Sequence, residues 1–369
     1  MPEGQRGLEG RTSVRGTMSG SPTRRDLDPE QVRHYLTASL GPAGEVAACG
    51  PLTGGGFAAV WWVRLTDGRE VVLKVGPPPG VPLLRYERDM IGAEARYLRL
   101  VADRAPTVPV PSLLHHGRHP ELGDWLLTAR LPGRTLWDLT RAGADVAPLR
   151  AEFGRALAAL HAVPDGRYGD GGRHGDGGRH GDGGRYGYDG GRAAASTWRG
   201  AYLAMVDDLL ADAADWAVPL PTSRIRASVA RHAAVLDAVR RPALLHVDGW
   251  AGNVLAVEGP DGTPRLSGLV DGERYLWGDP LLDLVSPLLF RRAEDEPDDP
   301  LVRGYRAVAP FPFDAAVRRR LGLYRLHLYL LMTVEMPSRG ITAASDPGRV
   351  ARLAELLDAE LADLSGPLN

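Results

Sequence analysis

The stretch that decides the fold is residues 245–283, LHVDGWAGNVLAVEGPDGTPRLSGLVDGERYLWGDPLLD. Two short apolar runs, 253–257 and 266–270, flank the turn-rich sequence EGPDGTPR, which is the pattern of an antiparallel hairpin. A hairpin brings its two ends together, so Asp248 and Asn253 before its first strand should converge with Asp271 after its second. Asp and Asn are common turn formers individually, but two acids and an amide at this spacing favour a Mg²⁺ site for phosphoryl transfer.

Two segments of this stretch, HVDGWAGN (246–253) and LVDGERYLWGDPLLD (269–283), resemble a known signature. It is the H-G-D-x-x-x-x-N … I-D-x-E … G-D-P-x-x-D signature of the aminoglycoside phosphotransferase family, a broad set of small-molecule kinases. The resemblance implies an α+β, two-lobed protein-kinase-like fold, with a small antiparallel-sheet N-lobe carrying one main helix and a larger, mostly helical C-lobe. It also implies that Asp248 is the catalytic base and that Asn253 and Asp271 hold magnesium.

The signature is not matched at every position. Val247 replaces the usual glycine, Gly249 replaces an apolar residue, and Trp250 stands where many members carry histidine. Gly272 replaces a bulky aromatic, so we expect looser packing beside Asp271. None of these changes removes a predicted ligand.

Composition is that of a soluble globular protein, with 44% hydrophobic and 24% charged residues in a chain of 369. A net charge of −2 gives no reason to expect nucleic acid or an anionic membrane as a partner. The single cysteine, Cys49, excludes an internal disulfide and suits the cytoplasm. We therefore expect a cytoplasmic protein whose partner is a small-molecule substrate, and the oligomeric state stays open.

Lysine usage singles out one residue. Lysine and arginine together number 44, and Lys74 is the only lysine among them. An arginine fork and a lysine ammonium have different shapes, so a site built for one does not accept the other. The position of Lys74 within the strand-like VVLKV favours a functional role over chance survival.

The sequence before Lys74 reads as strand, glycine turn, strand, turn and strand over residues 50–75. Its turn, Gly54, Gly55, Gly56 and Phe57, would let backbone N–H groups approach phosphates closely. A triple glycine is also common in plain hairpins, and only its place before the lone lysine favours the nucleotide-binding interpretation. The predicted helix 87–104 then supplies Glu94 as the candidate partner of Lys74, with Glu87 as the rival.

The boundaries of the lobes follow from the same elements. Residues 1–27 are polar and aperiodic, so they are predicted to be a disordered tail. Residues 28–131 form the nucleotide-binding N-lobe, and residues 132–366 form the catalytic and substrate-binding C-lobe. By resemblance, the segment after the strand 125–130 is the hinge, where the backbone of Ala129 and Leu131 would meet adenine.

Residues 165–192 repeat RYGDGG-like units with a period of six, and 13 of these 28 residues are glycine. The units lack the aliphatic residue of a hexapeptide β-helix, so a flexible, solvated insertion in the C-lobe is predicted. Weak metal binding by its histidines and aspartates is the alternative.

Three further features of the C-lobe have structural interpretations. His161 ends a predicted helix and is interpreted as a packing residue. Asp279-Pro280 predicts an N-cap and first turn, which makes Asp279 structural, and Asp283 one turn later has the same interpretation. The acidic run 294–299 would either attract a cationic substrate or form a solvated loop.

In order, the chain presents a glycine turn, a strand lysine, a helix glutamate, a hinge, a base and two metal ligands. This order matches the phosphoryl-transfer template. The sequence thus predicts an ATP- and Mg²⁺-dependent kinase that phosphorylates a hydroxyl of an aminoglycoside-like compound, an amino sugar or another hydroxylated amine, with ATP as co-substrate. The alternative is a nucleotide-binding pseudokinase without turnover. A protein kinase would need DFG and APE segments that this sequence lacks, and a metal-dependent hydrolase would leave Lys74 and the glycine turn unexplained.

Overall fold

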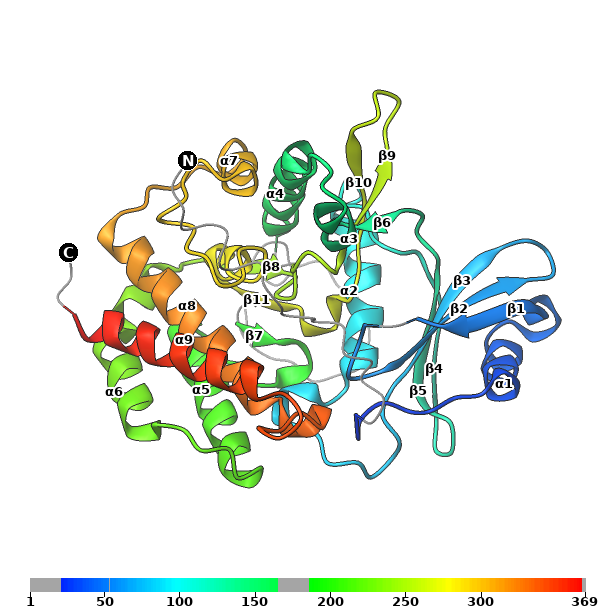
Figure 1. Cartoon of the computed structure of the whole chain (residues 1–369), viewed down its shortest axis with the longest axis horizontal. Helices are drawn as coiled ribbons and strands as arrows, with labels where there is room; N and C mark the ends of the chain where they lie inside the picture. Colours follow the sequence, from blue (N-terminus) through cyan, green and yellow to red (C-terminus); the bar gives the residue numbers. More distant parts are fainter. Residues whose placement is uncertain (1–20, 53, 165–185, 367–369) are drawn as a thin grey trace.

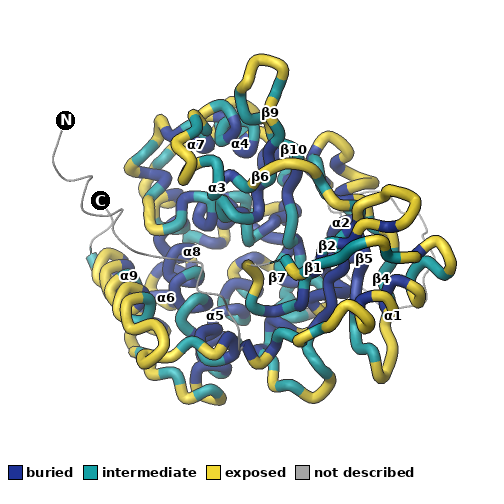
Figure 2. The backbone as a smooth tube through the Cα atoms, turned by 45° about the vertical axis from the view of Figure 1, so that its right-hand side comes forward, coloured by how far each residue is buried: buried dark blue, intermediate teal, exposed yellow. Residues whose placement is uncertain are grey.

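The computed structural model describes residues 21–52, 54–164 and 186–366. These residues form two lobes, with a twisted sheet in one and a helical assembly in the other (Figure 1). The predicted α+β, protein-kinase-like architecture is confirmed. The five-stranded sheet of the smaller lobe ends at Ala129, and the next strand, which begins at Arg134, pairs in a sheet of the larger lobe. Both lobes contain buried segments (Figure 2).

The N-lobe is built on a five-stranded antiparallel sheet with the order β1-β2-β3-β5-β4. Helix α1 (Pro29–Leu40) begins with a capping box in which Asp28 accepts hydrogen bonds from backbone N–H groups of the first turn, as its sequence predicts. Helix α2 (Met90–Arg104) lies between the sheet and the C-lobe (Figure 1). The strands are β1 (Val46–Pro51), β2 (Ala59–Leu65), β3 (Glu70–Val75), β4 (Leu113–His119) and β5 (Gly123–Ala129).

The alternation of side chains along β3 directs Lys74 toward the cleft. Val71, Leu73 and Val75 pack with the buried residues of α1 in one apolar cluster. Because successive side chains on a strand point to opposite faces, Lys74 points away from this cluster and toward α2. The strand therefore places the buried Lys74 on the side of the sheet that faces α2.

The C-lobe carries two small sheets, of order β10-β9-β6 and β7-β11-β8, surrounded by helices. Helices α4 and α7 approach closely because Gly154 and Gly304 face each other's backbone: a Cβ at Gly154 would lie 2.1 Å from the Leu301 carbonyl oxygen. None of the helices in the described part of the chain is long and apolar enough to span a membrane. The strands are β6 (Arg134–Thr135), β7 (Gly187–Tyr188), β8 (Ala243–Leu245), β9 (Val254–Glu258), β10 (Pro264–Leu269) and β11 (Leu276–Gly278). The helices are α3 (Leu136–Arg141), α4 (Ala147–His161), α5 (Trp198–Asp215), α6 (Thr222–His232), α7 (Pro300–Arg306), α8 (Ala315–Val334) and α9 (Pro347–Ser365).

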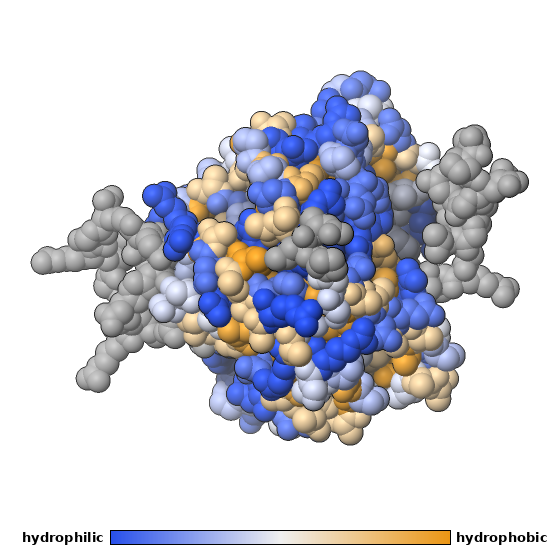
Figure 3. All heavy atoms as spheres, turned by 90° about the vertical axis from the view of Figure 1, so that its left-hand side faces the viewer, coloured by the Kyte–Doolittle hydropathy of each residue, from blue (hydrophilic) through white to orange (hydrophobic). Residues whose placement is uncertain are grey.

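The surface of the C-lobe is a mosaic of hydrophilic and small apolar areas (Figure 3). Among the described residues, the large hydrophobic side chains classed as exposed are Leu114, Phe290 and Val308. Single exposed hydrophobics of this kind are ordinary on a folded protein.

The predicted disordered tail ends earlier than expected. Residues 1–20 lie outside the described part, but the prediction is wrong for residues 21–27, which pack on the N-lobe. Ser21 and Thr23 are buried, and Arg25 donates a 2.9 Å hydrogen bond from Nε to the Gly76 carbonyl. Their polar composition misled the prediction because these side chains find backbone carbonyls of distant strands and turns.

The glycine-rich insertion also ends earlier than predicted. Residues 165–185 lie outside the described part, but residues 186–192 are packed, which corrects the solvated-loop prediction for its last unit. That unit, RYGYDGG, differs from its neighbours by a second tyrosine; Tyr186 and Tyr188 are both buried, and β7 pairs with β11. Asp189 forms an ion pair with Arg96 of α2. The free energy gained by burying two aromatic rings offsets the conformational entropy that the surrounding glycines lose on folding.

Candidate active site

The hairpin predicted from residues 253–270 is present and brings the expected residues together. Strands β9 and β10 pair antiparallel, with Leu269 opposite Val254 and a bulge between Leu266 and Gly268. The Val270 N–H donates to the Asn253 carbonyl at 3.0 Å, so the hairpin mouth closes directly between Asn253 and Asp271. The Asn253 side-chain amide donates to the Asp248 carbonyl at 2.9 Å. All three predicted residues therefore border one mouth.

Lys74 reaches this mouth from the N-lobe. Its Nζ lies 2.7 Å from both carboxylate oxygens of Glu94, contacts Oδ1 of Asp271, and is 3.8 Å from Oε2 of Glu273. The choice between the two candidate glutamates is settled in favour of Glu94. Glu87 instead accepts from the Leu84 N–H at 2.9 Å and pairs with Arg339.

The charges around Lys74 do not balance. Burial by itself lowers the pKa of Lys74, but Asp271 and Glu94 outweigh it and raise the pKa well above its usual value. Burial raises the pKa of both Glu94 and Glu273, and Lys74 offsets this only in part. In Asp271, the adjacent ammonium overcomes burial and holds the pKa below its ordinary value. Three carboxylates therefore share one ammonium, and a second cation would relieve the excess negative charge.

The same carboxylates form the one group with metal-ligand spacing among the described residues. Oxygen atoms of Glu94, Asp271 and Glu273 lie within 4.8 Å of one another. Hard oxygen donors of this kind suit Mg²⁺. The sequence prediction did not include Glu273, although an acid two residues after Asp271 is part of the signature and could have identified it.

Asp248 lies at the mouth with its side chain partly exposed. Burial raises the pKa of its carboxyl, and Arg274 lowers it less. The Nε of Arg274 lies 4.0 Å from Oδ2 of Asp248. The Nη2 of Arg274 donates a 3.0 Å hydrogen bond to Oε2 of Glu335. Asp248 is therefore a carboxylate in a shielded position beside one guanidinium, which suits an acceptor of a substrate proton.

The turn that carries Asp248 is held by Asp283. Asp283 accepts from the backbone N–H groups of His246 and Val247 at 2.6 and 2.5 Å. Val247 has a φ of 72°, and the two hydrogen bonds stabilise this left-handed backbone conformation. His161 bridges Asp283 and Tyr305 at 3.0 and 2.9 Å, so through Asp283 it helps to position the turn that carries Asp248. A structural role for Asp283 is predicted from the sequence, but its partners, the N–H groups of His246 and Val247, are visible only in the structure.

Asp279 has the structural role predicted for it. Its Oδ1 accepts from the Leu281 N–H at 3.1 Å, which caps the following helical turn. Its Oδ2 accepts from Arg320 and from the Tyr324 hydroxyl, both at 2.6 Å. The helical turn that follows β11 is thus anchored to α8.

The glycine turn is open on its outer side. A Cβ at Gly54 or Gly55 would meet nothing within 4 Å, and Gly54 has a φ of +136° that favours glycine. The Gly56 carbonyl accepts hydrogen bonds from Ser21 and Thr23, and Phe57 is buried. Phosphate binding by Gly54, Gly55, Gly56 and Phe57 stays a prediction.

The hinge residues differ in what they can offer adenine. The Ala129 N–H donates to the Ser112 carbonyl at 2.9 Å, so this group is engaged within the N-lobe. The Leu131 N–H has no hydrogen-bond partner within the described ranges. A Cβ at Gly268 would lie 2.1 Å from Leu131 Cδ1, so the glycine allows the leucine to rest on β10. Leu131 therefore retains a free donor at the lobe junction.

The looser packing expected at Gly272 is not found. Gly272 does not loosen the structure, because a Cβ there would lie 2.2 Å from the Tyr97 ring, which fills the space a bulky residue would take.

The acidic run 294–299 is partly structural. Glu294 is buried and accepts from Arg325 at 2.9 Å, and Asp299 caps α7 and pairs with Arg150 at 3.0 Å.

The comparisons with known proteins agree with this geometry. The sequence model of the phosphotransferase enzyme family (APH) matches residues 50–321. No curated protein sequence matches the chain. A structure of aminoglycoside phosphotransferase APH(4)-Ia with AMP-PNP and hygromycin B is similar, with a TM-score of 0.56, 17% identity, 91% of this chain and 100% of that chain covered. A candidate fructosamine-3-kinase from Thermobifida fusca YX-ER1 has a TM-score of 0.60, 21% identity, and coverage of 90% and 98%. A GDP and kanamycin complex of APH(2")-IIIa has a TM-score of 0.55, 16% identity, and coverage of 89% and 99%.

The fold and site define a small-molecule kinase, a phosphotransferase with a protein-kinase-like fold. The chain belongs to the APH phosphotransferase enzyme family, whose model covers most of its length.

Proposed function

We propose that this protein transfers the γ-phosphoryl group of ATP, with Mg²⁺, to a hydroxyl of a small hydroxylated amine such as an aminoglycoside or an amino sugar. The observation that carries the proposal is the meeting of Lys74, paired with Glu94, and Asp271 at the hairpin mouth that Asp248 and Asn253 border. In this arrangement β3 of the N-lobe supplies an ammonium group, and the ends of the β9–β10 hairpin of the C-lobe supply the Asp271 carboxylate that contacts it and the Asn253 amide.

The roles follow from the chemistry of each group. Lys74 would bind the α- and β-phosphates, and Glu94 would keep its side chain extended toward them. Asn253 and Asp271, with Glu273 nearby, would hold Mg²⁺, which supplies charge neutralisation to the phosphates. Leu131 would donate its free N–H to adenine, and the glycine turn would cover the phosphates.

Asp248 would orient the acceptor and take its proton. The substrate oxygen attacks the γ-phosphorus, the bond to the β-phosphate oxygen breaks, and the hydroxyl proton passes to Asp248. The products are a phosphate ester and ADP. The protein contributes positioning and electrostatics, without a covalent intermediate.

The acceptor class is inferred from two kinds of support. The similar structures were obtained with hygromycin B or kanamycin, or carry the name of a fructosamine kinase. Asp248 also stands among acidic groups that would attract an ammonium group beside the reacting hydroxyl. The one cysteine, Cys49, is unpaired, which supports a reducing, cytoplasmic setting.

The test is ADP release from MgATP in a screen of hydroxylated amines, sugars and antibiotics. The matched control is Asp248→Asn, which keeps the shape of the site and removes the base. We expect at least one acceptor to raise ADP release above the level of this variant. Nucleotide binding with no turnover across the screen would favour the alternative, a pseudokinase that binds nucleotide as a scaffold.

A further inference from the structure

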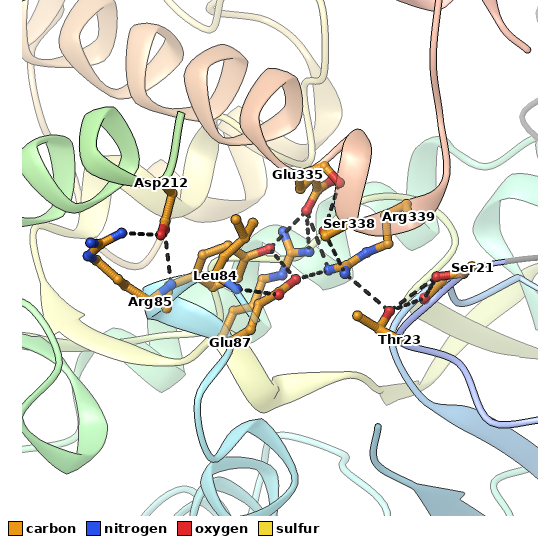
Figure 4. Close-up of polar contacts among 12 residues, drawn as sticks. Ser21, Thr23, Leu84, Arg85, Glu87, Asp212, Glu335, Ser338 and Arg339 are labelled. Carbon is orange, nitrogen blue, oxygen red and sulfur yellow. Dashed lines mark hydrogen bonds and ion pairs between the residues drawn. The ribbon is translucent and has the colours of Figure 1, made fainter. Parts of the chain in front are cut away.

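A second connection between the lobes is formed by Arg339, at the end of the short helical turn Pro337–Arg339 that follows α8. Its side chain is 6% exposed and forms an ion pair with Glu87, which precedes α2 and is fully buried. The guanidinium also lies over the ring of Phe57, 5.5 Å from its centroid, and donates to the Thr23 hydroxyl at 3.4 Å. One side chain of the C-lobe thus contacts three segments of the N-lobe. Figure 4 shows two of these contacts, with Glu87 and with Thr23.

The contacts of Arg339 lead directly to the glycine turn. Thr23 accepts from Arg339 and donates its own hydroxyl proton to the Gly56 carbonyl at 2.9 Å. Ser21 donates to the same carbonyl at 2.6 Å. Gly56 is therefore held on one side by the buried hydroxyls of Ser21 and Thr23, and the guanidinium of Arg339 orients the Thr23 hydroxyl. Figure 4 shows the contact between Thr23 and Arg339, with Ser21 beside it.

Holding this carbonyl also sets the direction of the next N–H. Because a trans peptide is planar, the Phe57 N–H points opposite to the Gly56 carbonyl. That N–H has no hydrogen-bond partner in the part of the chain that the structure describes. The arrangement leaves a fixed, unused donor on the face of the turn away from Ser21 and Thr23.

On the C-lobe side Arg339 is anchored in a buried polar network. It donates to Ser338 at 3.1 Å and lies 3.9 Å from Glu335. Glu335 also accepts from the Tyr86 hydroxyl at 2.9 Å and from Arg274 at 3.0 Å. Arginine side chains that pair with several buried acceptors hold their geometry more firmly than exposed pairs do.

We propose that Arg339 is a positioning residue that clamps the glycine turn, residues 54–57, to the C-lobe and presents the Phe57 N–H to the phosphates of the nucleotide. The inference rests on the proposed kinase function. It assigns a role to a residue that touches neither the base nor the predicted metal ligands. Removing the clamp should weaken binding of the phosphates and leave binding of the adenosine portion, which depends on the hinge.

A merely structural role for Arg339 makes a different prediction. Loss of a buried ion pair would lower the melting temperature and weaken adenosine and MgATP equally. Arg85 offers the matched control, because it also joins the lobes through an ion pair. The Nη1 of Arg85 lies 2.5 Å from Oδ1 of Asp212 and 2.8 Å from Oδ2 of Asp215, both on α5. In the described part of the chain, Arg85 forms no hydrogen bond or ion pair with the glycine turn.

The experiment compares affinities for MgATP and for adenosine, measured by calorimetry, in the wild type, Arg339→Gln and Arg85→Gln. For Arg339→Gln we expect MgATP affinity to fall about tenfold, equivalent to about 1.4 kcal/mol, with adenosine affinity within about twofold of the wild type. For Arg85→Gln we expect both affinities to stay at the wild-type level. Equal loss for both ligands in Arg339→Gln, or no loss, would overturn the proposal.

Two milder variants keep the test decisive if Arg339→Gln does not fold. Phe57→Leu removes the ring beneath the guanidinium, and Thr23→Val removes the hydroxyl between Arg339 and Gly56; both retain the ion pair with Glu87. Each variant should bind MgATP more weakly and adenosine with wild-type affinity. Wild-type affinity for MgATP in both variants would overturn the proposal that Arg339 clamps the glycine turn. Failure of the wild-type protein to bind MgATP would overturn the proposed function itself, and the clamp with it.

Discussion

Lys74 of β3 and Glu94 of α2 are paired through both carboxylate oxygens, each 2.7 Å from the Lys74 Nζ. The pair joins the sheet of the N-lobe to its main helix, and Asp271 of the C-lobe contacts the same ammonium. One ammonium group therefore connects β3, α2 and the C-lobe segment that carries Asp271. The length and shape of the Lys74 side chain therefore determine where its ammonium group lies.

Lys74→Arg should lose most phosphoryl transfer. Arginine keeps the charge, but its longer fork cannot occupy the point where Nζ meets Glu94 and Asp271. A displacement of about an ångström can reduce the rate about 100-fold. The measurement is the steady-state rate of ADP formation with an identified acceptor. The reverse exchange Arg64→Lys, at an exposed residue of the neighbouring strand β2, should have no effect. Wild-type turnover in Lys74→Arg would contradict the assigned site.

Asp248→Asn should bind MgATP with wild-type affinity and turn over about 10²- to 10⁴-fold more slowly, the usual contribution of a general base. The amide keeps the size of the carboxyl and cannot take the proton. Calorimetry and single-turnover kinetics separate the two effects. A variant that retains turnover would show that Asp248 is not the base.

The pH dependence of turnover should reflect the shielding of Asp248. Burial raises the pKa of its carboxyl, and the base works only when ionised, so activity should be lost on acidification at a higher pH than for an ordinary aspartate. Arg274 lowers this pKa, so Arg274→Met should move the acidic limb of the kcat profile to still higher pH. Arg274→Lys keeps the charge and should shift it less. An unchanged limb in Arg274→Met would show that another group controls it.

Asp271→Asn should abolish the part of nucleotide affinity that depends on Mg²⁺. The carboxylate is one of three that share a single ammonium, and its loss removes the negative charge that would attract the metal. Thermal shifts with ATP, with and without Mg²⁺, give the measurement. In the wild type Mg²⁺ should add to the shift, and in the variant it should not. Equal shifts with and without Mg²⁺ in both proteins would refute the metal assignment.

Gly272→Ala should destabilise the fold, because the added Cβ would lie 2.2 Å from the Tyr97 ring. Overpacking of a filled interior typically costs about 1–3 kcal/mol in the free energy of unfolding. Urea denaturation measures the change. Gly55→Ala, where the Cβ meets open space, is the control and should unfold at nearly the wild-type urea concentration. Equal stability of the two variants would mean that Tyr97 moves aside freely.

Features of the chain that depend on neighbouring residues could be predicted from the sequence. The hairpin 253–270, the N-caps Asp28 and Asp279 and the strand bearing Lys74 are encoded in residues a few positions apart. Turn formers, capping side chains and alternating apolar residues act over such distances, so the local pattern is sufficient. The grouping of Asp248, Asn253 and Asp271 followed because a hairpin necessarily joins its own ends.

Tertiary structure decided every partnership between distant segments. Glu87 and Glu94 are seven residues apart and equivalent in pattern, and only the tertiary packing pairs Glu94 with Lys74 and Glu87 with Arg339. The burial of Ser21, Thr23 and Tyr188 likewise depends on surfaces that other parts of the chain provide. A sequence records which groups are available. The choice among equivalent partners is made by the free energy of packing the whole chain, which no local pattern contains.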